Sequence, residues 1–366
     1  MDRVSITIDV TGLPPERITF APSPLAELGA MLHALSEPAH HPGLHSWATA
    51  TTAALKPVLA DRLTEADFMW RSARSDLLAP PRPGATLAED LDWIDSLDNR
   101  RFVKAAFEIS CNSSYESTVS PLDDADERAK VLELAAARGP RQAQFTERML
   151  DDPDGLRIWL RRLFEDCEQA FFGDTWQRIR VQLAADARHK TELLQRKGLA
   201  ETVSAVSEAI RLEEYGTGGQ RLVLDKLSTG TTSATAEGGL TFLPSAFGWP
   251  HLFAGHAPGW QPVILYPVAT PELPRPEALE LVQARLEALA HPMRMRLTRM
   301  LARSSHSTGE LATAFGITAP EVSRHLAVLK KAGLITTRRR GRYVLHQLDL
   351  QTVARLGSDF LETVLR

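Results

Sequence analysis

The residues best suited to chemistry lie near the C-terminal end of the chain, in two groups. One group is a basic run in which a single glycine interrupts four arginines: Arg338, Arg339, Arg340 and Arg342. Guanidinium groups form paired hydrogen bonds with phosphate oxygens, so this run predicts contacts with a phosphate backbone. The alternative for an isolated charge run is a solvated loop. The other group suits contacts with base edges: Thr318, Ala319, Pro320, Ser323, Arg324 and His325.

Two predicted helices across a tight turn position the second group. Ser307 or Thr308 can cap the first helix, and the Glu310 carboxylate then lies in its first turn, where the helix dipole favours negative charge. Gly316 marks the end of this helix, because glycine adopts the left-handed backbone that a tight turn needs.

The second helix has its own start signal and its own apolar face. Thr318 and Glu321 form the T-x-x-E pattern of a capping box, and Pro320 lies in the first turn, where a missing N–H does no harm. An apolar repeat at helical spacing should face inward, opposite Leu311 and Ile317. Its members are Val322, Leu326 and Leu329. The second group is then left on the outward, N-terminal side of this helix, which a recognition helix presents to base edges.

A basic β-hairpin is expected after the second helix. Gly333 follows the helix end, and Leu334 supplies the apolar closing contact. Leu334–Thr337 and Tyr343–Gln347 are β-prone runs, with the arginines between them at the hairpin tip. Two helices and a basic hairpin in this order predict a winged helix-turn-helix that binds double-stranded DNA. The remaining members of the predicted DNA-binding set are Lys330, Lys331 and Tyr343.

The residues from about Leu279 onward resemble the arsenic-repressor-type (ArsR) winged-helix regulators of bacteria. The resemblance is carried by four segments: 289–294 (LAHPMR), 309–312 (GELA), 320–326 (PEVSRHL) and 329–334 (LKKAGL). It implies a DNA-binding regulator in which flanking helices form a dimer seam. Metal-sensing members of that family carry cysteines before the recognition helix, whereas this chain has Ser307-Thr308-Gly309-Glu310-Leu311 there. The thiolate metal site of the family is therefore not implied.

Charge and length predict two domains. Residues 277–366 hold 14 Lys and Arg against 8 Asp and Glu, a net charge of +6. Of the 42 basic and 46 acidic residues in the whole chain, 28 and 38 remain for the rest, a net charge of −10. This asymmetry is typical of a nucleic-acid-binding module joined to an acidic body. The expected boundaries are a sensor or effector domain at 1–270, a proline-rich linker at 271–276 and the winged helix at 277–366.

The sequence favours a reducing compartment. Only Cys111 and Cys167 occur, too few for a disulfide framework. The N-terminus lacks the pattern of a signal peptide, and no run of 18 apolar residues is present. We therefore expect a cytoplasmic protein with no membrane partner.

The first domain is predicted to be α+β: mostly helical, with one small sheet formed from its two ends. Strands are expected at 3–10, 17–21, 221–227, 240–243 and 262–268. Pro24 opens a helix through Leu35, and further helices are expected near 44–60, 64–78, 86–110, 124–137, 140–150, 154–172 and 174–210. A Ser/Thr/Gly-rich loop is expected at 228–239, and a second loop, bracketed by Trp249 and Trp260, at 248–259. The whole chain also resembles actinobacterial regulators in which an uncharacterised N-terminal domain precedes an ArsR-type module. Three segments carry this resemblance: 23–28 (SPLAEL), 40–42 (HHP) and 240–245 (LTFLPS).

Histidines raise the question of a metal site. They gather in two places: His33, His40, His41 and His45, and then His251 and His256. His40 and His41 are adjacent, which favours a turn over two ligands on one helix face. With no companion cysteine and no H-E-x-x-H pattern, the sequence predicts capping and turn roles and no metal site.

Enzyme motifs are missing from the sequence. It has no G-x-S-x-G, no G-x-x-x-x-G-K-[ST] and no strand-linked G-x-G-x-x-G, and Gly216–Gly219 is too loose for a phosphate loop. Cys111 is expected to be an inert thiol despite the nearby Asn112, since no base stands beside it. We expect neither an enzyme nor a cofactor.

A ligand-sensing role is the preferred interpretation of the large first domain. All seven tryptophans lie before the linker, and large aromatics build either cores or apolar pockets. The side chains predicted to line a small-molecule effector pocket are Phe20, Trp70, Arg71, Phe107, Trp176, Phe242 and Trp249. Plain core packing is the alternative for each of them.

Two apolar stripes flank the predicted DNA reader and indicate a homodimer. One stripe comprises Leu279, Val282, Leu286 and Leu289, and the other Leu350, Val353, Phe360 and Val364. Packing of both stripes on their own reader is the alternative.

The hypothesis for the whole protein is a ligand-responsive repressor that binds a pseudo-palindromic operator. Two others stay open: an enzyme or small-molecule carrier that the DNA module localises, and a ligand-independent DNA binder.

Overall fold

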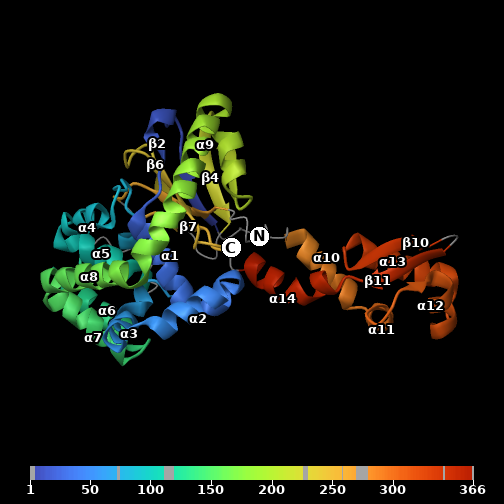
Figure 1. The fold of residues 1–366 in the computed structure, drawn as a ribbon. Coiled ribbons are helices and arrows are strands. Elements are labelled where there is room, and N and C mark those ends of the chain that lie inside the picture. The colour runs from blue at the N-terminus through green and yellow to red at the C-terminus, as the bar shows by residue number, and fades with distance from the viewer. Residues whose placement is uncertain are drawn as a thin grey trace. The chain divides into compact units, whose positions relative to one another are not determined.

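The chain folds into two compact units, Met1–Pro274 and Arg275–Leu365 (Figure 1). The computed structural model describes residues 5–71, 75–110, 119–225, 230–257, 259–268, 279–340 and 343–364. The predicted linker at 271–276 lies outside the described residues.

Two four-stranded sheets form the β part of the first unit, and each takes one strand from the N-terminal segment. The first has the order β3-β4-β1-β5: Ile210–Tyr215, Gly219–Asp225, Ser5–Asp9 and Gly230–Ser233. The second has the order β2-β6-β8-β7: Ile18–Phe20, Leu240–Ser245, Val263–Pro267 and Phe253–Gly255. β1 runs antiparallel to β4, whereas β2 runs parallel to β6.

The α+β fold class is confirmed, but the prediction of a single sheet was wrong. A turn at Gly12 and a short 3-10 helix at Pro15–Arg17 separate β1 from β2, so each strand finds its own partner. The prediction also missed β3, and it placed β5 and β7 in loops. Both are short strands that pair with a longer one: β5 pairs with β1, far away in sequence, and β7 pairs with the next strand, β8.

Helices make up the middle of the first unit. The α-helices are α1 (Pro24–Ser36), α2 (His45–Ala54), α3 (Pro57–Ala66), α4 (Leu87–Asp95), α5 (Asn99–Ser110), α6 (Ala125–Ala136), α7 (Pro140–Asp151), α8 (Pro153–Cys167) and α9 (Gly173–Val206). The predicted helices at 44–60 and 86–110 are each two helices. The predicted helix at 64–78 was wrong, since α3 ends at Ala66 and only 3-10 turns follow at Asp67–Met69 and Asp76–Leu78. Leu77, Leu78 and Ala79 are all buried.

Helix α1 lies at the centre of the first unit. The Ser23 hydroxyl accepts a hydrogen bond from the Ala26 amide at 3.0 Å, and Pro24 occupies the first helical position. Every residue from Pro24 to Ala34 is buried, including Glu27. The Glu27 carboxylate accepts hydrogen bonds from the Ala246 and Phe247 amides at 2.9 and 3.0 Å. These bonds tie α1 to the segment that follows β6.

The second unit is built from five helices and a three-stranded sheet within its described residues. The helices are α10 (Leu279–Leu289), α11 (Pro292–Leu301), α12 (Thr308–Phe315), α13 (Ala319–Lys331) and α14 (Leu350–Val364). The sheet has the order β10-β11-β9, formed by Ile335–Arg340, Tyr343–Leu348 and His306–Ser307. Figure 1 shows α12 and α13 beside the β10–β11 hairpin. In neither unit does the described part of the chain contain a helix long and apolar enough to cross a membrane.

Candidate nucleic-acid interface

Helix α12 begins and ends at the predicted residues. The Ser307 hydroxyl accepts a hydrogen bond from the Glu310 amide at 3.3 Å, and the Glu310 carboxylate accepts one from the Ser307 amide at 2.7 Å. This reciprocal pair is a capping box. The Ser307 hydroxyl also donates to the Glu310 carboxylate at 2.8 Å, and the two hydrogen bonds from the Ser307 amide and hydroxyl lower the pKa of Glu310. Gly316 ends the helix with a φ of 65°, in the left-handed region.

Helix α13 begins at the predicted place, but its predicted capping box is wrong. Thr318 is the N-cap residue, yet its side chain makes no capping hydrogen bond. The Glu321 amide donates to the Thr318 carbonyl at 3.1 Å instead, so the donor that a capping box would use is already engaged. Pro320 lies in the first turn, as predicted.

The predicted inward and outward faces of α13 are confirmed. Val322, Leu326 and Leu329 are at most 3% exposed and form one core with Leu311, while Ile317 packs against that core. The outward side of the N-terminal half is exposed at Thr318, Ala319, Pro320, Ser323 and Arg324, and half-buried at His325. The N-terminal end of a helix also carries partial positive charge, which suits an anionic ligand.

The C-terminal end of α13 is closed by a Schellman motif. The Leu334 amide donates to the Leu329 carbonyl at 2.9 Å, and the Gly333 amide donates to the Lys330 carbonyl at 3.0 Å. Gly333 has a φ of 69°, as the motif requires, and Leu334 is buried. Lys330 and Lys331 remain exposed in the last turn. The motif directs the chain from the helix straight into the wing.

The wing is an antiparallel hairpin, and three of the four predicted arginines lie on its first strand. The sequence placed them at the loop tip, but β10 continues to Arg340, and Arg338, Arg339 and Arg340 face Leu345, Val344 and Tyr343 across the ladder. Successive strand side chains point to opposite faces, so Arg338 and Arg339 lie on opposite faces of the hairpin. Arg338 and Arg339 are exposed. The side chains of Arg340 and Tyr343, and the whole of Arg342, lie outside the described residues.

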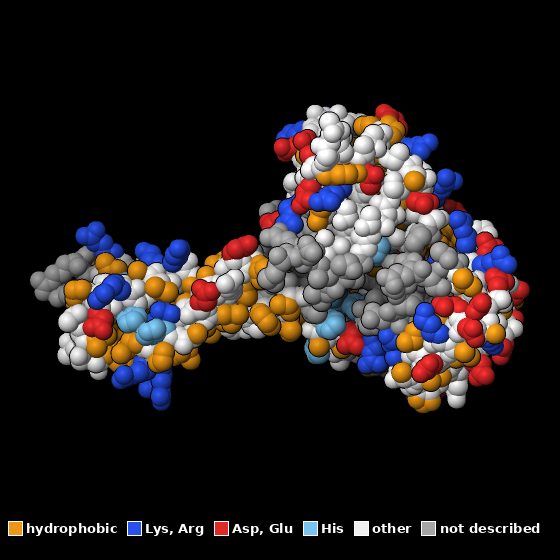
Figure 2. Space-filling model, turned by 180° about the vertical axis from the view of Figure 1, so that it is seen from behind, with side chains coloured by type: hydrophobic (Ala, Val, Ile, Leu, Met, Phe, Trp, Pro, Cys, Tyr) orange, Lys and Arg blue, Asp and Glu red, His pale blue; other side chains and the backbone are white. Residues whose placement is uncertain are grey.

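His325 sits beside His291 at the edge of the outward face. Their ring centroids are 5.0 Å apart. Burial lowers the pKa of His325, and the neighbouring His291 and Arg294 lower it further. A neutral imidazole offers one donor and one acceptor, so His325 can match a base edge or a phosphate. Figure 2 shows Lys and Arg side chains, in blue, projecting from this unit.

A buried ion pair fixes the flanking helices to the end of α13. The Arg285 guanidinium on α10 lies 3.0 Å from the Asp359 carboxylate on α14, and both side chains are at most 6% exposed. Arg285 also donates to the Ala332 carbonyl at 3.3 Å. No local sequence pattern indicates this pair, because 74 residues separate its members.

Comparison with known proteins assigns both parts of the chain. A family of unknown function, DUF5937, matches residues 4–272, and a helix-turn-helix domain family matches residues 289–338. The HTH-type transcriptional repressor SmtB of Mycobacterium tuberculosis is 37% identical over 100 residues, which are 24% of this chain and 74% of that repressor. The chain belongs to DUF5937, and its C-terminal unit is an ArsR-type winged helix.

Two further similarities fall in the same C-terminal part. The biofilm growth-associated repressor of Agrobacterium fabrum is 39% identical over 71 residues, 19% of this chain, and the match spans 61% of that repressor. A solved structure, the homodimeric winged helix-turn-helix DNA-binding domain of Mb0332 from Mycobacterium bovis, is 30% identical. That match covers 24% of this chain and 79% of that domain, with a TM-score of 0.21.

In the DUF5937 unit, the side chains predicted to line an effector pocket are dispersed. Phe20 stacks on Phe242 with ring centroids 4.7 Å apart, whereas Trp70 is buried elsewhere and donates from Nε1 to the Ser36 hydroxyl at 3.0 Å. Arg71 is exposed and pairs with Glu37 at 2.7 Å. The other described members, Trp176 and Trp249, are buried, and the side chain of Phe107 lies outside the described residues.

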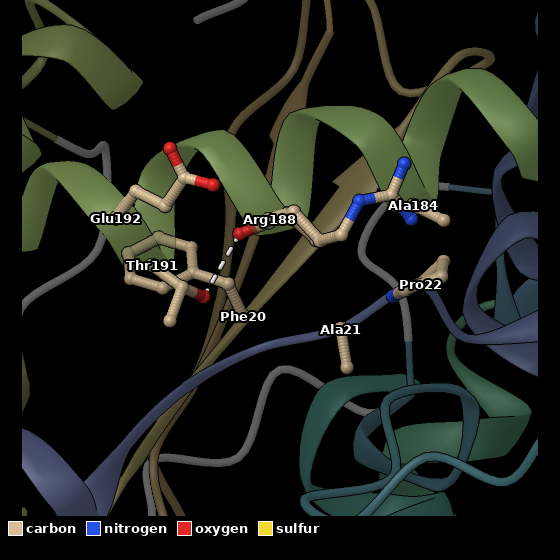
Figure 3. A pocket seen from close by; sticks show the side chains of 8 residues that line it. Phe20, Ala21, Pro22, Ala184, Arg188, Thr191 and Glu192 are labelled. Carbon is tan, nitrogen blue, oxygen red and sulfur yellow. Dashed lines mark hydrogen bonds between the residues drawn. The ribbon is translucent and has the colours of Figure 1, made fainter.

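A hollow of about 350 Å³ lies in the DUF5937 unit beside the end of β2. Figure 3 shows Phe20, Ala21 and Pro22 on one side of it and α9 on the other. The dashed line is the Thr191 hydroxyl donating to the Ala187 carbonyl at 2.9 Å. Helix α9 also contributes Ala184, Arg188 and Glu192. Among the described members of the predicted pocket set, only Phe20 lines this hollow.

The DUF5937 unit also contains a cluster that sequence reasoning missed. His33, His40 and His251 meet, although 218 residues separate the first from the last. The sequence features that could have predicted this cluster are the four histidines at 33–45 and His251 in a loop bracketed by tryptophans.

Proposed function

We propose that this protein is a DNA-binding transcriptional repressor that acts as a homodimer on a pseudo-palindromic operator and responds to a small-molecule effector. The observation that carries the proposal is the exposed N-terminal face of α13 above a fully apolar inner face, next to a hairpin with exposed arginines. A recognition helix reads the major groove with such a face, and a wing contacts the backbone or the minor groove.

Different residues of this surface have different tasks in the proposal. Ser323 and Arg324 read base edges, because they are exposed near the start of α13. Thr318, Ala319, Pro320 and His325 complete the face that enters the groove. The charged groups that hold phosphate are Lys330, Lys331, Arg338, Arg339, Arg340 and Arg342, with Tyr343 beside them.

Exposed apolar side chains on α10 and α14 support the homodimer. The two predicted apolar stripes contain both buried and exposed side chains in the structure. Val282 is buried, and Leu289 and Val353 pack on the core of their own unit. The remaining members are 42–56% exposed: Leu279, Leu286, Leu350, Phe360 and Val364. Figure 2 shows orange side chains gathered over these helices. A second copy would cover them, and two-fold symmetry would present two recognition helices to two half-sites.

The DUF5937 unit is the proposed effector domain, in the cytoplasm where the operator lies. A ligand can release DNA only if it binds the free and the DNA-bound forms with different affinity. The hollow beside β2 and α9 is a candidate position for such a ligand.

Selection of bound genomic DNA by the purified full-length protein tests the proposal. We expect one enriched sequence with two inverted half-sites whose centres lie about one helical turn, or a multiple of it, apart. Binding should exceed that to unrelated duplex at moderate salt, where nonspecific electrostatic binding weakens. Equal binding to every duplex would overturn the proposal.

A further inference from the structure

Four histidine rings from two separate parts of the chain gather at the C-terminal end of α1 in the first unit. His33 lies on α1, His40 ends the 3-10 helix at Pro38–His40, His41 follows it, and His251 follows β6. The ring of His251 lies 4.8 Å from that of His33 and 5.6 Å from that of His40. Ligand nitrogens of His33, His40 and His251 all lie within 4.8 Å of one another.

Backbone carbonyls fix the tautomer of two of these rings. Nδ1 of His33 lies 2.7 Å from the Trp70 carbonyl, and Nδ1 of His41 contacts the Trp249 carbonyl. A carbonyl only accepts, so each Nδ1 must donate, and the lone pair of the neutral ring is then on Nε2. Histidines that bind metals are held in this way, with the other ring nitrogen donating to a carbonyl or carboxylate. His33 is therefore oriented as a ligand before any metal arrives.

The spacing of the His33 and His251 ligand atoms suits one small cation. Nε2 of His33 lies 3.2 Å from Nε2 of His251. Two nitrogens on one tetrahedral zinc ion, each at about 2.0–2.1 Å, would lie about 3.3–3.4 Å apart. Nδ1 of His40 is buried and has no hydrogen-bond partner among the described residues. A cation bound through Nδ1 of His40 would satisfy that atom.

We propose that His33, His40 and His251 bind a divalent transition-metal ion of the zinc class. Imidazole nitrogen suits zinc, copper, nickel and iron, whereas calcium and magnesium require oxygen ligands. Three protein ligands leave one position of a tetrahedral ion for water or a further ligand. His40 and His251 are half-buried, which gives the ion a route from solvent, whereas His33 is buried.

The adjacent pair His40 and His41 does not count against this site. The prediction against a metal site rested on this adjacency, which favours a turn over two ligands on one helix face, and on the lack of a companion cysteine or an H-E-x-x-H pattern. In the structure only His40 belongs to the ligand set, while His41 contacts the Trp249 carbonyl and packs edge-on against His33 and His251. The bound ion would join α1 to the segment after β6. The Glu27 carboxylate already joins the same two elements through its hydrogen bonds with the Ala246 and Phe247 amides.

Metal titration of the full-length protein, stripped by a chelator, tests the proposal. We expect Co²⁺ alone to bind at one site per chain with the visible absorption of a four-coordinate ion, and Zn²⁺ alone to displace it. His33→Gln, His40→Gln and His251→Gln should each weaken binding by more than about tenfold, since even supporting residues of metal sites are worth that much. Zn²⁺ should raise the melting temperature of the wild type, because it binds only the folded state.

Two control variants locate the site. His45→Gln changes an exposed histidine close in sequence to the cluster, and the double variant His291→Gln/His325→Gln changes the histidine pair of the other unit. Both should keep the full Co²⁺ signal. Because His33 is buried, His40→Gln is the decisive variant, and its metal-free melting temperature should match that of the wild type. Absence of saturable binding, or binding that survives His40→Gln and His251→Gln, would show only a hydrogen-bonded histidine cluster and overturn the proposal.

Discussion

Arg324 and Arg339 are both exposed arginines, but their positions predict different losses on substitution. Arg324 lies near the start of α13 and Arg339 lies on β10. Arg324→Ala should cost about 1–3 kcal/mol on the operator and relax the preference at one base position, because it removes a base contact. Arg339→Ala should weaken binding to all sequences and reduce the salt slope by about one, because it removes a phosphate contact. Quantitative binding to a set of single-base operator variants, at several salt concentrations, separates the two effects.

Arg211→Ala is a matched control for both changes. It removes one positive charge at an exposed position on β3, in the other unit. We expect it to leave both affinity and base preference unchanged. An equal loss on every sequence for Arg324→Ala would show that this residue contacts only the backbone.

His256 predicts loss of stability in mild acid. Burial lowers its pKa below the ordinary value of 6.5, although a hydrogen bond with the Ala254 carbonyl opposes this shift. As pH falls through 6.5, the unfolded chain takes up a proton at this residue while the folded chain does not. The unfolded state then binds more protons than the folded state, so the free energy of unfolding decreases as the pH decreases.

Urea unfolding of His256→Gln and the wild type between about pH 7.5 and pH 5.5 measures this contribution. We expect the variant to lose stability less steeply than the wild type over this range. His189→Gln, at an exposed position on α9, should keep the wild-type slope. Parallel curves for the wild type and His256→Gln would contradict the prediction.

At the scale of elements, the turn after α13 predicts a cost for a single added methyl group. Gly333 has a φ of 69°, and left-handed backbone costs other residues about 1–2 kcal/mol. Gly333→Ala should therefore destabilise the second unit by about that amount and loosen the junction between recognition helix and wing. Gly309→Ala is the control, since Gly309 is within α12 and a Cβ there would meet no atom within 4 Å. It should be neutral or stabilise by up to about 1 kcal/mol. Thermal melting of both variants checks the difference.

The second unit could be predicted from sequence in most details because its signals are local. Caps, glycine turns and an apolar repeat within one helix all act over a few residues, and α12 and α13 follow them. The Thr318 capping box failed because a backbone carbonyl competes for the Glu321 amide, which spacing alone does not show. In the first unit, β5 depends on β1, a partner more than 200 residues away, so the Ser/Thr/Gly-rich composition of its segment was misleading. β7 pairs with the neighbouring strand β8, but its three residues are too few to form a recognisable strand pattern.

At the scale of the whole molecule, an effector pocket was the feature least predictable from the sequence, because it depends on contacts between residues that are distant in the chain. Aromatic residues mark a core and a pocket equally well, and Phe20, Phe242 and Trp70 pack in the core. The histidine cluster and the buried pair Arg285–Asp359 both join residues far apart in the chain. Spacing cannot show which distant residues meet, whereas the charge asymmetry between the two units could be read directly by counting.

The exposed apolar faces of α10 and α14 predict the state of assembly. Leu286 and Phe360 are 42% and 43% exposed, and burial of such side chains against a second copy would stabilise a dimer. Phe360→Glu places a charge in the proposed seam, so we expect light scattering to show the mass of a monomer where the wild type shows a dimer. Affinity for the full operator should fall much further than affinity for a single half-site, because the second half-site adds binding only when the two readers are linked. Val181→Glu, at a 66% exposed position on α9, should change neither measurement. A wild-type protein that remains monomeric at micromolar concentration and binds the full operator no better than a half-site would exclude this seam.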